Sequence, residues 1–105
     1  MFTLDELAET IAGRAAAASA EKSYTRSLLD KGPAHCARKF GEEAIELTIA
    51  AVAEDENAVR AEAADVLYHM LVLLHARGVA FASVMGELEA RVHRSGHEEK
   101  ASRGA

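Results

Sequence analysis

Residues 39–76 decide the fold of this chain, and they read KFGEEAIELTIAAVAEDENAVRAEAADVLYHMLVLLHA. Two stretches with helical patterns stand on either side of a short acidic turn, EDEN at 54–57. Short connections between helices make them antiparallel neighbours. The stretch therefore predicts a helical hairpin, and with it an all-α fold.

Each helix of the hairpin carries two carboxylates three residues apart, Glu43 with Glu46 and Glu62 with Asp65. Side chains at this spacing project from one face of a helix, with Cβ atoms roughly 5–6 Å apart. In a hairpin the two pairs would face each other, and four carboxylates in a poorly solvated place need protons or cations to offset their repulsion. Oxygen ligands favour Mg²⁺, with Mn²⁺ as a substitute, over zinc.

A simpler interpretation is that these carboxylates are solvated surface charges, since glutamate is a common helix former. Against it, residues 58–76 are apolar on nearly all sides, which is the pattern of a helix buried all round. Glu62, Asp65 and His69 form one polar stripe on this helix. Buried charges are usually paired or bound to metal, which favours the metal site. For His69 we expect a hydrogen-bonded place in the core.

A length of 105 residues predicts one domain, 1–105, with a polar tail from about residue 95. Its architecture is expected to be a compact bundle of about four helices. The first runs from the Thr3 capping box to about Ser19, the second from Ala34 to about Ala53, and the third from the acidic turn to Gly78. The fourth carries an apolar stripe from Phe81 to Val92, and a polar connection is expected at 21–33.

Composition excludes several classes of function. A net charge of −5 argues against binding a nucleic-acid polymer, which needs a broad cationic face. The chain shows neither a basic start typical of a signal peptide nor an apolar run long enough to cross a membrane, so we expect a cytoplasmic protein without membrane contact. Cys36 is the only cysteine and is expected to be a packed thiol.

Four segments carry a resemblance to a known family. GEEAIE at 41–46 and EAADVLYH at 62–69 resemble the EExxE and ExxD pair of the all-α nucleoside triphosphate pyrophosphohydrolases, the MazG-like superfamily. KSYTRSLLDKG at 22–32 and SGHEEKASR at 95–103 resemble, within it, the phosphoribosyl-ATP pyrophosphatase family. The resemblance implies a dimerising all-α enzyme that uses Mg²⁺ to hydrolyse phosphoribosyl-ATP to phosphoribosyl-AMP and pyrophosphate, the second step of histidine biosynthesis.

The resemblance also assigns roles to residues. It implies that Glu43, Glu46, Glu62 and Asp65 bind the metal. Glu42 would hold a further Mg²⁺ or orient the attacking water, and Lys39 would hold a phosphate oxygen, so the catalytic group comprises Glu42, Glu43, Glu46 and Lys39. Substrate contacts would come from Lys22, Ser23, Tyr24, Thr25, Lys39, Ser95, Gly96, Lys100, Ser102 and Arg103.

The amino-acid sequence alone leaves other interpretations open. Lys39 could be a solvated or ion-paired lysine, and Ser23 to Thr25 could be an ordinary helix cap. The whole chain could instead be a house-cleaning pyrophosphatase for dNTPs, which shares the paired carboxylates but not the basic tail. A non-enzymatic acidic dimerisation module is the third possibility, and it predicts indifference to Mg²⁺.

Overall fold

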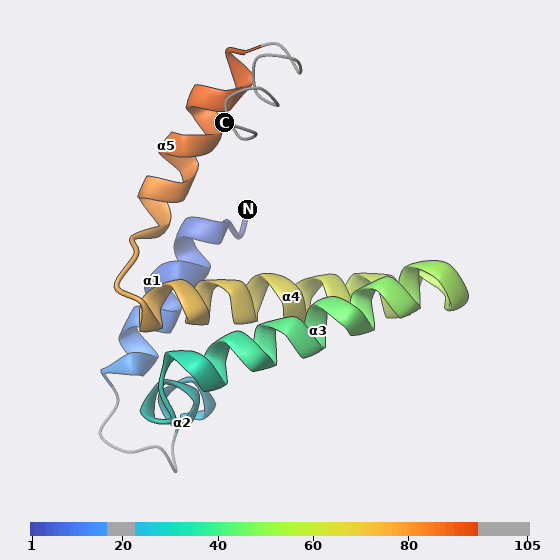
Figure 1. Ribbon diagram of the computed structural model, residues 1–105, viewed down its shortest axis with the longest axis horizontal. Coiled ribbons are helices and arrows are strands. Elements are labelled where there is room, and N and C mark those ends of the chain that lie inside the picture. Colours follow the sequence, from blue (N-terminus) through green and yellow to red (C-terminus); the bar gives the residue numbers. More distant parts are fainter. Residues whose placement is uncertain (17–22, 95–105) are drawn as a thin grey trace.

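The computed structural model describes residues 1–16 and 23–94. Within these ranges the chain forms five helices and no strand, which confirms the predicted all-α class (Figure 1). The central feature is a long hairpin of α3 and α4. Helices α1 and α2 pack at one end of it, and α5 projects away from it (Figure 1).

Helix α1 spans Leu4–Ala15. Thr3 caps its start, because its hydroxyl accepts a hydrogen bond from the backbone N–H of Glu6 at 3.1 Å. The expected end near Ser19 is wrong, since Ala16 already has the non-helical angles φ −86° and ψ 5°. Helices in proteins depend on the packing of an apolar face, and an alanine run supplies little of it.

Helix α2 spans Tyr24–Asp30 and corrects the prediction of a polar connection at 21–33. It brings the helices of the described residues to five, beside the expected number of about four. Ser23 caps it by accepting a hydrogen bond from the Arg26 backbone N–H at 3.1 Å. Arg26 also pairs with Asp30 at 3.0 Å, and Leu28 is buried in the core. Because a helix this short shows no periodic apolar face, its existence depends on tertiary packing.

Helices α3 (Pro33–Ala53) and α4 (Glu56–Ala76) form the predicted antiparallel hairpin (Figure 1). Gly32, at φ 93°, precedes Pro33 at the start of α3. The carboxylate of Asp55 caps α4 by accepting a hydrogen bond from the Ala58 backbone N–H at 2.9 Å. Gly78, at φ 69°, follows the end of α4, as its sequence position predicts.

The core lies where α1, α2 and the C-terminal half of α4 meet the start of α3. Ile11, Leu28, Cys36, Leu71 and Val72 are its buried members. The Cys36 Sγ donates a hydrogen bond to the Leu28 carbonyl at 3.3 Å, and burial raises the pKa of this thiol. Cys36 is therefore a packed thiol, as predicted.

Helix α4 is not buried all round, contrary to the prediction from its composition. Only His69, Leu71 and Val72 are buried, and Leu67 is 39% exposed. The reason is geometric, because the half of α4 nearest the turn has only α3 beside it (Figure 1). Within one chain, α3 therefore covers one side of that half of α4, and the other sides stay exposed.

Helix α5 spans Phe81–Val92 and lies at 112° to α4. Phe81 packs against the core, but Met85, Leu88 and Val92 of the predicted apolar stripe are exposed. In the described part of the chain no single helix is long and apolar enough to span a membrane, and only the bent pair of α4 and α5 meets both criteria together.

Candidate metal centre

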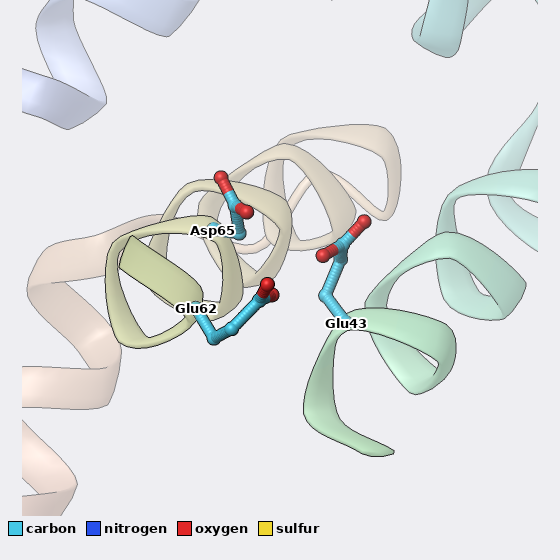
Figure 2. Close-up of side chains that lie close together, drawn as sticks. All are labelled: Glu43, Glu62 and Asp65. Atoms are coloured by element: carbon cyan, nitrogen blue, oxygen red, sulfur yellow. The ribbon is translucent and has the colours of Figure 1, made fainter. Parts of the chain in front are cut away.

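Three of the four predicted metal ligands converge between α3 and α4. Glu62 of α4 extends toward Glu43 of α3, and Asp65 of α4 stands beside them (Figure 2). Each of the three offers a carboxylate oxygen within 4.8 Å of the others. The three-residue spacing places Glu62 and Asp65 on one face of α4, and the hairpin brings Glu43 opposite them. We call these three residues the carboxylate cluster.

Glu46 lies beside the carboxylate cluster, but it is not one of the three residues that share this spacing. Burial is the largest cause that raises the pKa of Glu43, followed by a hydrogen bond with Glu46 and the negative charge of Glu46. Burial also raises the pKa of Glu62 most, followed by the charges of Glu46 and Asp65. Carboxylates this close repel one another when charged, so Glu43, Glu46, Glu62 and Asp65 together favour bound protons or a cation.

The donor set of the carboxylate cluster fits a hard divalent cation. The Oε2 atom of Glu62 is shielded from solvent and has no hydrogen-bond partner in the described part of the chain. A shielded carboxylate oxygen without a partner is costly, and a cation would satisfy it. Oxygens that share one Mg²⁺ lie about 2.0–2.1 Å from the ion and so roughly 3–4 Å from each other. The oxygens of the carboxylate cluster lie within 4.8 Å of one another, so a small movement of the side chains would bring them to that spacing.

Lys39 and Glu42 form a charged pair on α3, where Lys39 lies one helical turn before Glu43 and Glu42 directly precedes it. The Lys39 Nζ lies 3.3 Å from Glu42 Oε2, and the Arg38 Nε lies 3.7 Å from Glu42 Oε1. The hydrogen bond with Glu42 is the main cause that raises the pKa of Lys39, and Tyr24 and Glu43 contribute less. Lys39 is therefore ion-paired here. Its contact with phosphate and the role of Glu42 in catalysis stay predictions.

His69 lies in an aromatic cluster that also contains Tyr24 and Tyr68. Its ring meets both tyrosine rings edge-on, with centroid distances of 6.4 Å to Tyr24 and 5.1 Å to Tyr68. Burial lowers the pKa of His69, and the charge of Lys39 lowers it further. The predicted burial is confirmed at 5% exposure. The predicted hydrogen bond is not found among the described residues, since this side of α4 faces aromatic rings.

The hydroxyl groups of Ser23 and Thr25 serve the fold in this structure. Ser23 caps α2, which is the ordinary role left open for it, and the Thr25 hydroxyl lies 2.5 Å from the Tyr68 hydroxyl. Tyr24 stands between these two buried residues and is itself 58% exposed. The other predicted substrate contacts fall outside the described residues and stay predictions; they are Lys22, Ser95, Gly96, Lys100, Ser102 and Arg103.

Tyr68 is absent from the predicted site although it joins α4 to α2. It bonds to Thr25, which is 43 residues away in the sequence, and its ring stacks with Tyr24 at a centroid distance of 6.4 Å. No local pattern links partners so far apart. One signal was present, because Tyr68 follows Asp65 by three residues and therefore shares its side of the helix.

The site lies in a chain that matches known proteins along most of its length. Residues 4–92 match the Phosphoribosyl-ATP pyrophosphohydrolase family. The chain belongs to this family. The Phosphoribosyl-ATP pyrophosphatase 1 of Rhodopseudomonas palustris is 58% identical over 102 residues, which cover 97% of this chain and 94% of the relative. The protein of the same name from Bradyrhizobium diazoefficiens is 60% identical over 102 residues, which cover 97% of this chain and 95% of the relative.

A third relative is matched over its whole length. The Phosphoribosyl-ATP pyrophosphatase of Cereibacter sphaeroides is 53% identical over 104 residues, which cover 99% of this chain and 100% of the relative. Membership of the phosphoribosyl-ATP pyrophosphohydrolase family confirms the resemblance that the sequence motifs indicated. The matched range contains the five helices of the described residues, and with them the carboxylate cluster and the aromatic cluster.

Proposed function

We propose that this chain hydrolyses phosphoribosyl-ATP to phosphoribosyl-AMP and pyrophosphate in a Mg²⁺-dependent reaction. The observation that carries the proposal is the carboxylate cluster, which lies inside the range matched by the phosphoribosyl-ATP pyrophosphohydrolase family. The reaction breaks a phosphoric anhydride bond with water. A site for it must gather anionic phosphates next to carboxylates, and that requires cations.

Glu43, Glu62 and Asp65 would hold Mg²⁺, with Glu46 as the fourth ligand and Mn²⁺ as a substitute metal. The Glu62 Oε2 atom has no hydrogen-bond partner among residues 1–16 and 23–94, and the pKa values of Glu43 and Glu62 are raised. Both observations support this assignment, because each indicates a shortage of positive charge. When bound, Mg²⁺ supplies a Lewis acid that polarises phosphate oxygens and lowers the pKa of water.

The side chains near the carboxylate cluster would bind and orient the substrate. Lys39 would exchange its exposed ion pair with Glu42 for a phosphate oxygen, which costs little because such pairs contribute roughly 0–1 kcal/mol. Once released from Lys39, Glu42 would hold a further ion or orient the attacking water. The basic tail residues Lys100 and Arg103 would bind phosphate groups of the substrate.

This activity is the second step of histidine biosynthesis, and we propose that the protein carries it out in the cytoplasm. We further propose that the whole chain forms one domain and works as a homodimer. Apolar side chains left exposed on α3 and α5 support the dimer. They are Ile45, Ile49, Val52, Met85, Leu88 and Val92.

The shape of the chain supports the dimer as well. Its radius of gyration is 15.9 Å, against about 13 Å expected for a compact domain of this length. The excess arises because the hairpin and α5 extend away from the small core (Figure 1). A second copy packed on these elements would bury the apolar surface that one chain leaves exposed.

The deciding experiment measures pyrophosphate release from phosphoribosyl-ATP with and without Mg²⁺, beside a panel of dNTPs. We expect Mg²⁺-dependent release from phosphoribosyl-ATP at far higher kcat/KM than from any dNTP. Preference for a dNTP would instead indicate a house-cleaning pyrophosphatase. A chain that neither binds Mg²⁺ in a calorimetric titration nor releases pyrophosphate would overturn the enzymatic proposal.

A further inference from the structure

Tyr24 combines a ring held by two aromatic contacts with a large exposed area. We propose that the Tyr24 ring is the surface on which the purine base of the substrate stacks, with Thr25 and Tyr68 as the residues that position it. This inference rests on the proposed function. It assigns the substrate contact that the resemblance implies for Tyr24 to the ring of this side chain.

The ring of Tyr24 is held from two directions. It stacks with Tyr68 at an interplanar angle of 16°, and it meets the His69 ring at 90°. Aromatic pairs in such offset and edge-on arrangements contribute about 0.5–1.5 kcal/mol beyond the area they bury. Tyr24 nevertheless stays 58% exposed, so ring surface remains available to a ligand.

The backbone of Tyr24 is held as firmly as its ring. Its two neighbours in sequence are buried, Ser23 at 8% exposure and Thr25 at 1%. Ser23 caps α2, while the Thr25 hydroxyl bonds to the Tyr68 hydroxyl on α4. With both neighbours turned inward, the side chain between them must turn outward. A preorganised ring loses little conformational entropy when a ligand stacks on it.

The position of Tyr24 relative to the charged groups suits a nucleotide. Tyr24 lies close enough to Lys39 to contribute to the raised pKa of that lysine, and Glu43 of the carboxylate cluster contributes as well. On α4, His69 follows Asp65 by four residues, which is about 6 Å along the helix axis. A nucleotide carries its base and its phosphates on opposite sides of a ribose. Phosphates held at Lys39 and the carboxylate cluster would leave the base near Tyr24.

The experiment compares ATP with inorganic triphosphate, which carries the phosphates without the adenosine. Calorimetric titration with Mg²⁺ present would give the Kd of each probe for the wild-type chain, Tyr24→Ala, Tyr24→Phe and a control, Phe2→Ala. Phe2 is a suitable control because it is an exposed ring of similar exposure, 65%, that belongs to no aromatic pair among the described residues. Thermal unfolding would verify that each variant folds.

For Tyr24→Ala we expect the Kd for ATP to rise about tenfold, which lies within the range measured for base stacking on aromatic side chains. The Kd for triphosphate should stay within about twofold of wild type, and Tyr24→Phe should bind both probes like wild type. Phe2→Ala should match wild type as well. The KM for phosphoribosyl-ATP should rise with the Kd for ATP.

Three results would overturn the inference. One is equal weakening of ATP and triphosphate in Tyr24→Ala, which would indicate a phosphate contact or a structural role. A second is an affinity of wild type for ATP no greater than for triphosphate. The third is weakened ATP binding in Tyr24→Phe, which would indicate a hydroxyl contact. Absence of turnover of phosphoribosyl-ATP by wild type would overturn the proposed function alone, since the two binding titrations do not depend on turnover.

Discussion

Replacing Glu62 by Gln should remove the response of the fold to Mg²⁺. The substitution keeps the size of the side chain but removes a charged ligand from the carboxylate cluster. In the wild-type chain the Oε2 atom of Glu62 is shielded and has no hydrogen-bond partner among the described residues. A glutamine amide can donate to the neighbouring carboxylates, so the metal-free variant should be more stable than the metal-free wild type at neutral pH.

The magnitude follows from linkage between binding and folding. An ion present at about 100 times its Kd stabilises the folded state by ~2.7 kcal/mol. An unfolding entropy of about 2.1 cal/mol/K per residue gives ~0.22 kcal/mol/K for 105 residues. The melting temperature of the wild-type protein should therefore rise by ~12 °C at that Mg²⁺ concentration, and that of Glu62→Gln should rise far less.

Circular dichroism can follow thermal unfolding of chelator-treated protein at increasing Mg²⁺ concentrations. It measures both the stability of the metal-free proteins and the rise of the melting temperature with Mg²⁺. The matched control is Glu89→Gln, which changes an exposed carboxylate on α5 and should respond to Mg²⁺ like wild type. If Mg²⁺ stabilised Glu62→Gln as much as wild type, Glu62 would not be a ligand. A wild-type protein that did not respond to Mg²⁺ would remove the carboxylate cluster as a magnesium site.

Three further results are expected. Without metal, the free energy of unfolding of wild type should fall more steeply than that of Glu43→Gln as pH rises from about 4 to about 7.5. The reason is that the folded chain keeps the Glu43 proton above the ordinary pKa of 4.5, after the unfolded chain has lost it. Urea unfolding at several pH values measures this free energy, and an equal pH dependence of the two proteins would contradict the prediction. Tyr68→Phe should lower the free energy of unfolding by about 1–3 kcal/mol, because it leaves the buried Thr25 hydroxyl unpaired. The double variant with Thr25→Val should lose much less than the sum of the two single variants, because both substitutions remove the same hydrogen bond. Replacing Lys100 and Arg103 together by Ala should lower kcat/KM for phosphoribosyl-ATP at least about tenfold, and unchanged turnover would show that the tail does not bind substrate.

Several features followed from local sequence because local chemistry determines them. The Thr3 cap and the glycine after α4 were predicted correctly, since a cap depends on residues within one turn of the helix end. The carboxylate cluster followed from two short-range facts, the three-residue spacing on each helix and the short turn between the helices. Burial of α4 could not be predicted this way, because composition does not reveal how many neighbours a helix has.

The sequence by itself determined the all-α class, the hairpin and the face on which the carboxylates lie, because helix periodicity and a tight turn leave few alternatives. Only the tertiary structure decided that α2 forms, that Glu46 stands beside the carboxylate cluster, and that Thr25 and Tyr68 meet across 43 positions of sequence. These outcomes depend on contacts between segments far apart in the chain, and no local periodicity encodes such contacts. The position of the exposed Tyr24 ring near Lys39 likewise depends on contacts between distant segments.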